Sequence, residues 1–452
     1  MSISKVLIAN RGEIAVRIIR AARTLGLATA QVYSEADRDM LAVRLADEAV
    51  GIGPPPAAKS YLRGDAILRA AAAVGADAIH PGYGFLAENA DFAAAVEDAG
   101  LVFIGPAAAT IRQMGDKARA RAVAAALGVP TVPGSQTRLT DFNDTLALGR
   151  HIGFPVMIKA LAGGGGCGLR IAEDEAALTA LLPASAAEAK TAFGDDGLYL
   201  ERFIPRARHI EVQVLGDGDD AIHLYDRECS LQRRRQKLWE EAPAATLPVD
   251  VRQRLCEAAV RLARAVAYRG AGTVEYLYDE TTGEFFFIEM NTRIQVEHAV
   301  TEMVTGIDIV ATMIRIAAGE RLPFRQDEVR IQGHAIECRI NAEDPARQFM
   351  PAPGMVTTLR IPDETGVRFD TMLYPGCMVP PFYDSLVGKL IVWDETRAAA
   401  LARLGRALGV LAVGGIATTI PLHAALVRDA DVAAARFHTR WLETWLVTHP
   451  PG

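Results

Sequence analysis

The sequence contains little cysteine and no long apolar run. None of its five cysteines belongs to a CxxC pair; they stand apart as Cys167, Cys229, Cys256, Cys338 and Cys377. Scattered cysteines argue against structural zinc and against a disulfide framework, and they are typical of the reducing cytoplasm. No stretch approaches the roughly 18 uninterrupted apolar residues of a membrane helix. The first residues, MSISKVLIANRGE, lack the apolar core of a signal peptide. We therefore expect a cytoplasmic protein without a membrane segment.

An excess of positive charge is also absent. The formal net charge is -7, which gives no support to a nucleic-acid-binding function. Hydrophobic residues make up 50% and charged residues 23% of the chain, proportions that are typical of a globular enzyme. The length of 452 residues predicts one large multi-lobed unit or two to three domains.

Two common phosphate-binding motifs are missing. The first expected strand-to-helix turn reads Asn10-Arg11-Gly12-Glu13 rather than GxGxxG, which disfavours a Rossmann dinucleotide site. A glycine-rich loop, residues 162–168, follows a strand that ends near Lys159, but it does not read GxxxxGKS or GxxxxGKT, so a P-loop is excluded. Consecutive glycines still let backbone N–H groups approach phosphate oxygens. Beside Lys159, the loop predicts a mobile lid over a triphosphate; a flexible surface loop is the alternative.

The order of apolar segments predicts an α/β protein. Residues 1–114 alternate strands and helices, which indicates a parallel sheet. The expected elements are strands at Val6–Ala9, Thr29–Tyr33, Ala76–His80 and Val102–Ile104, and helices at Ile14–Leu25 and Phe92–Ala99. A compact insertion is expected over residues 131–203, with strands at Val156–Ala160 and Leu198–Glu201, then a mixed sheet from Ile210 to Asn291 and a last lobe from about Gly333.

The most informative segment is FFFIEMNTRIQVEH, Phe285–His298. As one extended strand it would place five polar side chains on a single face, namely Glu289, Asn291, Arg293, Gln295 and Glu297. The preceding residues predict a hairpin that turns at Thr281–Gly283 and sets Glu275 opposite Glu289. Facing carboxylates repel each other at a Cβ separation of about 5 Å, unless a divalent cation lies between them. Oxygen ligands suit Mg²⁺ or Mn²⁺, although solvated surface charges are the ordinary alternative.

A set of motifs in a fixed order resembles biotin carboxylase from about Lys5 to His423. The motifs are IANRGEIAVRIIR, HPGYGFLAENADFA, MGDKARAR, GGGGCGLR, HIEVQV, RECSLQRRRQK, EEAPA, EMNTRIQVEH, HAIECRINAEDP and PPFYDSLVGKLI. The resemblance implies an ATP-grasp ligase that carboxylates biotin with ATP and bicarbonate. It also implies an N-terminal α/β domain at 1–114, an ATP-grasp domain at 115–325 with the glycine-rich lid at about 131–203, and a C-terminal biotin carboxylase domain at 333–445.

The resemblance assigns roles to the matching residues. ATP would be bound by Lys117, Lys159, Gly164, Gly165, Gly166, Glu201, Arg202, Phe203, Ile204, His209, Gln232, Arg235, Glu275 and Glu289. Metal ions, two Mg²⁺ or Mn²⁺, would be held by Glu275, Glu289 and Asn291; bicarbonate by Lys237, Arg293, Gln295 and the Val296 backbone; and biotin by Tyr83 and Arg339. The catalytic residues would be Lys237, Arg293, Glu297 as the base, and Arg339. Taken singly, each of these residues has an ordinary structural alternative, and Glu88 and Arg17 are expected to be structural, at a subunit contact.

Two positions depart from the family pattern. Cys167 stands where the family usually has arginine in the glycine loop, and Arg235 stands where it usually has histidine. The first change removes a positive charge from the lid, and the second adds one near the nucleotide. We expect altered ATP affinity with the chemistry retained.

Partners follow from what the chain lacks. No methionine precedes a lysine, so the Met-Lys of a biotinyl domain is absent. We expect biotin to arrive on a separate biotin carboxyl carrier protein, carboxyltransferase subunits to take the product, and the chain to form a homodimer. The sequence does not specify the final acceptor, which could be acetyl-CoA, propionyl-CoA, another acyl-CoA, pyruvate, 2-oxoglutarate or urea. A related ATP-grasp ligase with a different acceptor, and a catalytically weak scaffold, are the alternatives.

Overall fold

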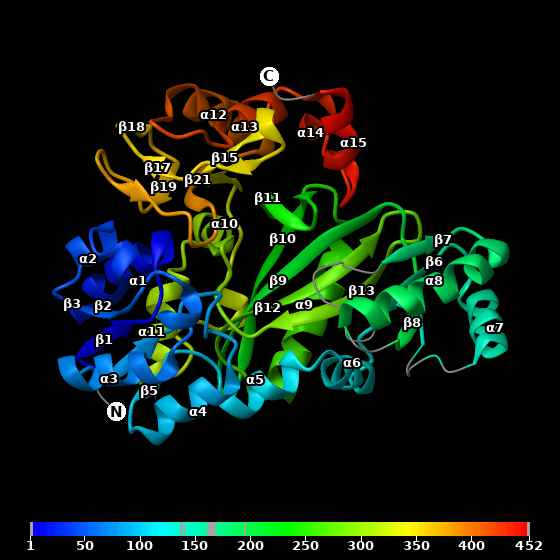
Figure 1. The fold of residues 1–452 in the computed structure, drawn as a ribbon, viewed down its shortest axis with the longest axis horizontal. Coiled ribbons are helices and arrows are strands. Elements are labelled where there is room, and N and C mark those ends of the chain that lie inside the picture. Colours follow the sequence, from blue (N-terminus) through cyan, green and yellow to red (C-terminus); the bar gives the residue numbers. More distant parts are fainter. Residues whose placement is uncertain (1–2, 136–138, 140, 161–168, 194–195, 450–452) are drawn as a thin grey trace.

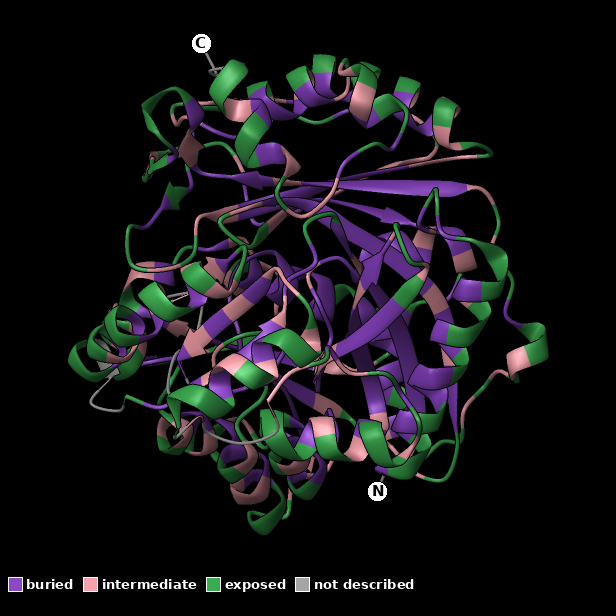
Figure 2. Ribbon diagram, turned by 90° about the vertical axis from the view of Figure 1, so that its right-hand side faces the viewer, coloured by how far each residue is buried: buried purple, intermediate pink, exposed green. Residues whose placement is uncertain are grey.

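Three regions meet around a central sheet in the computed structural model, which describes residues 3–135, 139, 141–160, 169–193 and 196–449 (Figure 1). The N-terminal region lies on one side of the sheet, a small projecting region lies on the other, and the C-terminal lobe lies above. Figure 2 shows that the central strands are mostly buried, whereas the surrounding helices expose one face. No helix within the described part of the chain is long and apolar enough to cross a membrane.

The N-terminal region contains the predicted parallel sheet. Its strands are β1 (Lys5–Ile8), β2 (Ala28–Ser34), β3 (Glu48–Gly53), β4 (Ala78–His80) and β5 (Val102–Phe103), in the order β3-β2-β1-β4-β5. The main helices are α1 (Gly12–Thr24), α2 (Leu41–Leu45), α3 (Gly64–Val74) and α4 (Ala90–Asp98). All neighbouring strands run parallel. Strand β3 was not predicted because only one of its six residues is buried, so it lacks the apolar run of a buried strand.

The projecting region is a small antiparallel sheet with two helices. Helices α5 (Ala108–Gly115) and α6 (Lys117–Ala126) lead toward it. It consists of α7 (Phe142–Ile152), β6 (Val156–Ala160), β7 (Arg170–Ala172), α8 (Glu175–Phe193) and β8 (Leu198–Arg202), with the strand order β7-β6-β8. Both strands expected here are confirmed. The predicted glycine loop, with Gly164, Gly165, Gly166 and Cys167, lies outside the described residues.

One eight-stranded sheet forms the centre of the molecule. Its strands are β9 (Ala207–Asp217), β10 (Ala221–Arg233), β11 (Gln236–Ala242), β12 (Arg269–Asp279), β13 (Glu284–Asn291), β14 (His334–Asn341), β19 (Val367–Thr371) and β21 (Leu386–Asp394). The order is β13-β12-β9-β10-β11-β14-β21-β19, and every pair is antiparallel, so the expectation of a mixed sheet was wrong. Helix α9 (Val249–Ala265) packs against β9 and β10. Because β14 pairs with β11, the sheet continues into the C-terminal lobe.

The predicted hairpin is confirmed by strands β12 and β13. Glu275 faces Glu289 in the register, and the chain turns after Asp279, where Gly283 N donates to Asp279 O at 2.8 Å. The expectation of one strand as far as His298 was wrong, because β13 ends at Asn291. β13 is an edge strand, and its only ladder, with β12, stops at the pair Thr273–Asn291, so no ladder holds the residues after Asn291 extended. They turn back toward the sheet and lead into α10 (His298–Thr305) and then α11 (Ile309–Ala317).

The C-terminal lobe surrounds the far end of the central sheet. Its short strands are β15 (Glu343–Asp344), β16 (Met350–Pro351), β17 (Gly354–Met355), β18 (Thr358–Arg360), β20 (Met378–Val379) and β22 (Ala412–Gly414). Its helices are α12 (Arg397–Val410), α13 (Ile420–Leu426), α14 (Ala430–Ala433) and α15 (Trp441–Thr448). Buried side chains of β11, β14, β21 and α12 form one apolar core, which fixes the lobe to the strands that carry Lys237 and Arg339.

Candidate active site

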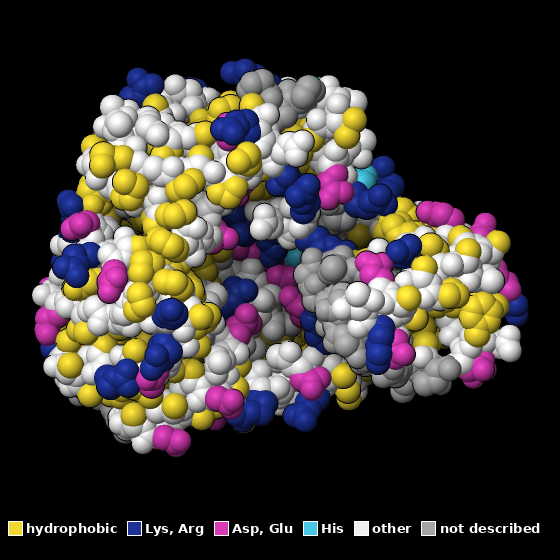
Figure 3. Space-filling view, in the orientation of Figure 1, with side chains coloured by type: hydrophobic (Ala, Val, Ile, Leu, Met, Phe, Trp, Pro, Cys, Tyr) yellow, Lys and Arg dark blue, Asp and Glu magenta, His cyan; other side chains and the backbone are white. Residues whose placement is uncertain are grey.

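Charged side chains gather in the hollow between the three regions (Figure 3). They come from the β12–β13 hairpin, from β9, β11, β14 and β21, and from the segment between β13 and α10. Many are buried in spite of their charge, and burial of unpaired charge is costly. The pairing of these groups therefore shows how the site is organised.

Lys237 lies at the centre of this cluster and contacts three of its acids. Its Nζ lies 2.6 Å from Glu211 Oε2, 2.6 Å from Glu297 Oε1 and 3.0 Å from Glu275 Oε1, and it donates to Gln295 Oε1 at 3.2 Å. Burial lowers the pKa of Lys237, but the carboxylates of Glu211, Glu275 and Glu297 outweigh burial and raise the pKa well above its ordinary value. Lys237 is therefore a permanent cation that draws together acids from β9, β12 and the turn before α10.

A thiol and a second cation also belong to this cluster. The thiol of Cys229 on β10 lies within 4.8 Å of the carboxylate oxygens of Glu211 and Glu297. Glu211 is held from its other side by Arg227, whose Nε lies 2.6 Å from Glu211 Oε1. Both Arg227 and Glu211 are fully buried.

Glu297 lies between two cations. Its Oε1 accepts from Lys237, and its Oε2 accepts from Arg339 at 2.9 Å. Burial raises the pKa of Glu297, but the charges of Lys237 and Arg339 outweigh burial and bring the pKa below its ordinary value. The carboxylate is therefore ionised at neutral pH, which a general base requires.

Arg339 joins this base to a further acid that the sequence did not reveal. Its Nε donates to Glu240 Oε1 at 2.5 Å, while its terminal nitrogen contacts Glu297. Burial lowers the pKa of Arg339, but Glu240 and Glu297 raise it above its ordinary value, so the guanidinium stays charged. Arg339 lies on β14 beside β21, where its register partner is Lys389.

The acidic hairpin carries oxygen donors of the kind that a divalent metal site uses. Glu275 and Glu289 face each other, and Asn291 Nδ2 donates to Glu275 Oε1 at 3.0 Å. Burial raises the pKa of Glu289, and the charge of Glu275 raises it further. The nearest cation to Glu289 is Lys117, whose Nζ is 3.8 Å from Oε2. A cation between the two acids would relieve this repulsion, and the available donors are the hard oxygens that Mg²⁺ prefers.

Arg293 has a partner that was expected to be structural. Its Nε donates to Glu88 Oε2 at 2.8 Å, and Thr292 N donates to Glu88 Oε1 at 3.0 Å. Arg293 also donates to Asn291 Oδ1 at 3.1 Å. Glu88 therefore fixes the guanidinium beside the metal-type ligands. Arg17, in contrast, lies apart from this cluster and pairs with Glu302 and Asp308.

The residues assigned to ATP fall into two groups. His209 and Gln232 lie together, with Gln232 Nε2 2.9 Å from His209 Nδ1, and His209 Nε2 is 3.1 Å from Glu275 Oε2. Lys159 and Arg121 both contact the carboxylate of Glu201. These contacts place Lys159 with the projecting region rather than with the Lys237 cluster.

The remaining residues assigned to ATP have surroundings of their own. Phe203 and Ile204 are buried beyond β8, and Arg202 is 3.8 Å from Asp279. Arg235 lies in the β10–β11 turn at φ 66°, and burial lowers its pKa. The departure at Arg235 therefore lies at a turn, outside the network around Lys237.

Glu13 and Lys389 form a second buried ion pair. Tyr83, assigned to biotin, and the backbone of Val296, assigned to bicarbonate, both contact this pair. Tyr83 donates its hydroxyl to Glu13, and Lys389 Nζ donates to the Val296 carbonyl and lies 3.5 Å from Glu13 Oε1. Lys389 is fully buried. It was not predicted, although it stands in the quoted motif PPFYDSLVGKLI.

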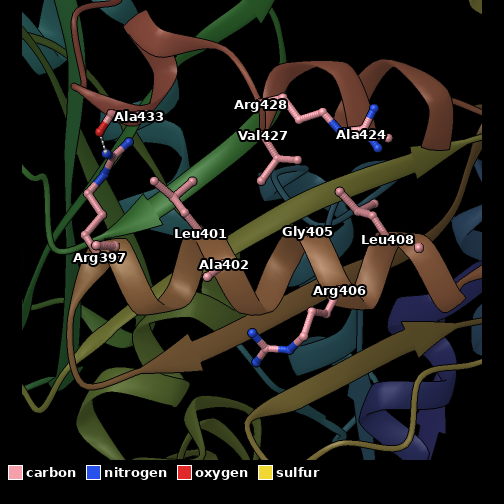
Figure 4. Close-up of a pocket in the computed structure, with 12 residues that line it drawn as sticks. Arg397, Leu401, Ala402, Gly405, Arg406, Leu408, Ala424, Val427, Arg428 and Ala433 are labelled. Atoms are coloured by element: carbon pink, nitrogen blue, oxygen red, sulfur yellow. Dashed lines mark hydrogen bonds between the residues drawn. The ribbon is translucent and has the colours of Figure 1, made fainter.

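A separate cavity lies away from this cluster. It has a volume of about 790 Å³ and is formed between α12 and the helices that follow it (Figure 4). Arg397 on its wall donates to Ala433 O at 2.6 Å. Apolar and small side chains line most of the rest, so this cavity brings together no acid and base and is not the active-site candidate.

Comparison with known proteins decides the family. The chain is 54% identical over 443 residues to the biotin carboxylase of Pseudomonas aeruginosa, covering 98% of each chain, and 50% identical over 444 residues to biotin carboxylase 1 of Bacillus subtilis, covering 98% of this chain and 99% of that one. The chain belongs to the biotin carboxylase family. Family models match in order: biotin carboxylase, N-terminal domain, at residues 2–111; carbamoyl-phosphate synthase L chain, ATP binding domain, at 116–325; and biotin carboxylase C-terminal domain, at 337–444.

Solved structures agree with this membership. The biotin carboxylase of Campylobacter jejuni, in a β-γ-ATP complex, has a TM-score of 0.92 and 45% identity over 98% of this chain and 99% of that one. The biotin carboxylase domain dimer of Hydrogenobacter thermophilus 2-oxoglutarate carboxylase, in complex with MgADP, ADP and bicarbonate, has a TM-score of 0.90 and 46% identity over 98% of both chains. The ATP-grasp fold inferred from the motifs is therefore confirmed.

Several residues of this biotin carboxylase family site were missed by sequence reasoning. Glu211, Glu240 and Lys389 are fully buried in strands, and the motifs had assigned them no role. A charged residue that interrupts a buried strand is itself a signal, since such residues are almost never fully buried without a partner. Glu88 gave no such signal, because its side chain is 41% exposed.

Proposed function

We propose that the protein uses ATP and bicarbonate to carboxylate biotin that is delivered on a separate carrier protein. The observation that carries the proposal is the row Lys237–Glu297–Arg339, in which an ionised buried carboxylate lies between two partly buried cations. It lies beside an acidic hairpin suited to a nucleotide-bound cation. Such a row can both deprotonate a weak nucleophile and stabilise the anions that result.

In the first step Glu297 acts as the base. It takes the proton of bicarbonate while a bicarbonate oxygen attacks the γ-phosphorus of ATP, so that ADP leaves and carboxyphosphate forms. Lys237, Arg293, Gln295 and the Val296 backbone hold the bicarbonate. Glu275, Glu289 and Asn291 would hold two divalent ions, Mg²⁺ or Mn²⁺, which would neutralise the charge of the ATP phosphates. Lys117, Lys159, His209 and Gln232 bind the nucleotide.

In the second step Arg339 faces biotin. The C–O bond of carboxyphosphate breaks to give CO₂ and phosphate, the released phosphate takes the proton of biotin N1, and negative charge develops on the ureido oxygen. The fixed guanidinium of Arg339 stabilises that oxygen, and Tyr83 lines the pocket. N1 then forms its bond to the carbon of CO₂, which gives carboxybiotin for transfer to an acceptor on carboxyltransferase subunits.

The wider setting belongs to the same proposal. It includes a homodimer in the cytoplasm and a lid, formed by about residues 131–203, that closes on ATP. The proposed domains are 1–114, 115–325 and 333–445. The dimer is supported by the Hydrogenobacter thermophilus relative, whose biotin carboxylase domain is described as a dimer.

The test is ADP release by the purified protein with bicarbonate, with and without free biotin. The proposal expects biotin to stimulate ADP release, and Glu297→Gln to abolish that stimulation. Turnover that ignores biotin but responds to another acceptor would favour a related ATP-grasp ligase. Absence of any turnover would favour a scaffold.

A further inference from the structure

Two buried carboxyl groups next to Arg339 have no part in the steps above. Glu240 on β11 and Glu337 on β14 face each other in the register, and both are 0% exposed. Facing side chains of neighbouring strands lie about 5 Å apart at Cβ. Glu240 Oε1 accepts from Arg339, but Glu240 Oε2 and both oxygens of Glu337 have no hydrogen-bond partner within the described part of the chain.

The surroundings do not supply enough positive charge for two ionised groups. The charged or titratable side chains that face the pair are Lys237, Glu297, Cys338, Arg339 and Lys389. Each cation is already engaged: Lys237 by Glu297, Arg339 by Glu240 and Glu297, and Lys389 by the Val296 carbonyl. Two like charges buried side by side repel each other strongly, so the pair binds at least one proton.

The direction of titration agrees with this geometry. Burial raises the pKa of Glu337 well above its ordinary value, and Glu240 adds to that rise. Burial also raises the pKa of Glu240, to about 7, although Arg339 opposes the shift. The pair therefore carries one proton above neutral pH, on Glu337, and two protons below it.

We propose that Glu240 and Glu337 form a carboxyl pair that shares one proton above neutral pH and positions Arg339 for the biotin ureido oxygen. The inference rests on the proposed function of Arg339. With Glu337 neutral, the guanidinium faces two carboxylates, Glu240 and Glu297, rather than three. The carboxylate of Glu240 then holds Arg339 Nε in place, and the charge of Arg339 is not fully cancelled. As the pH falls, a second proton binds to Glu240 and weakens this hydrogen bond.

Two variants separate the roles of the pair. Glu240→Gln replaces the charge-assisted hydrogen bond to Arg339 by a weaker neutral one, so we expect kcat for biotin carboxylation to fall about ten- to a hundredfold, with the KM for ATP unchanged. The pH profile of the wild-type rate should show an inflection near pH 7, and the profile of Glu240→Gln should lack it. The amide in Glu337→Gln resembles the protonated carboxyl group of Glu337. Above neutral pH, the kcat of this variant should therefore stay within about twofold of the wild-type value.

Infrared spectroscopy tests the proton directly. Above neutral pH, where Glu240 is ionised, the wild-type protein should show the carbonyl band of a buried protonated carboxyl group, and Glu337→Gln should lack it. Glu395→Gln, at an exposed position, is the control and should retain the band. Failure of Glu337→Gln to remove a band would overturn the inference, as would a loss of kcat in folded Glu337→Gln equal to that of Glu240→Gln.

The remaining outcomes are also decisive. Should Glu337→Gln fail to fold, the pH profiles of the wild type and Glu240→Gln still decide, since an inflection that persists in Glu240→Gln contradicts the pair. A wild-type protein without biotin-stimulated turnover would refute the proposed function, and the infrared band would then report separately on the shared proton.

Discussion

Replacing Lys237 by methionine removes the cation on which three buried acids converge. Methionine has a similar length and no charge, so the main change is electrostatic. Lys237 contacts Glu297 at 2.6 Å, and its charge is the first of those that lower the pKa of this carboxylate. Without it, the pKa of Glu297 must rise, because burial then meets only the opposing charges of Arg339 and Arg227.

The size of the effect follows from Coulomb's law. Two unit charges about 4 Å apart interact by about 4 kcal/mol at an effective dielectric constant of about 20. One pKa unit corresponds to about 1.4 kcal/mol, so loss of Lys237 raises the pKa of Glu297 by up to about three units. An ionised base is needed for the reaction. The variant should therefore lose rate as the pH falls through the new pKa, by about tenfold per pH unit below it.

The assay is bicarbonate-dependent ADP release, measured against pH for the wild type, Lys237→Met and Lys59→Met. Lys59 is exposed in the N-terminal region and serves as the matched control. We expect Lys59→Met to follow the wild-type profile. The rate ratio of Lys237→Met to wild type should decline steadily toward acid pH, with circular dichroism showing a folded protein throughout. A ratio that is constant with pH would refute the proposed role of Lys237 in keeping Glu297 ionised.

Three further predictions concern single contacts. Glu289→Gln should raise the KM for Mg-ATP at least about tenfold, because a charged ligand is worth more than about 1.4 kcal/mol; an unchanged Mg²⁺ titration of the rate would contradict this role. Glu88→Gln should raise the KM for bicarbonate about tenfold by loosening Arg293, and an effect on the KM for ATP alone would count against it. Arg227→Met should lower the free energy of unfolding by about 3–5 kcal/mol, since Glu211 loses a buried partner; urea unfolding with an unchanged midpoint would disprove that.

Local patterns predicted the hairpin and its register. Alternation of apolar and polar residues, with a turn that contains Gly283, was enough to set Glu275 opposite Glu289. Such features depend on residues close in sequence, and they are the part of a fold that sequence determines most directly. The parallel N-terminal sheet was predictable for the same reason, because its strands are short apolar runs separated by helices.

Pairings between distant segments were not predictable in the same way. Nothing near Trp239 indicates that β11 pairs with β14, about a hundred residues later in the chain, and this pairing alone brings Glu240 and Glu337 face to face. The turn after Asn291 was missed because an alternating pattern describes a strand only while a neighbouring strand pairs with it. Glu88 could be placed beside Arg293 only once the N-terminal region and the hairpin were seen together.

The continuous sheet has a consequence for attempts to dissect the protein. A fragment that ended before β14 would strip the pairing partner from β11 and leave a row of unsatisfied backbone groups beside Trp239, which is otherwise 1% exposed. Open sheet edges of this kind recruit other chains. We therefore expect the ATP-binding segment expressed alone to aggregate. Removing β14 would therefore cost both activity and stability, because the strand that carries Arg339 is also the strand that pairs with β11.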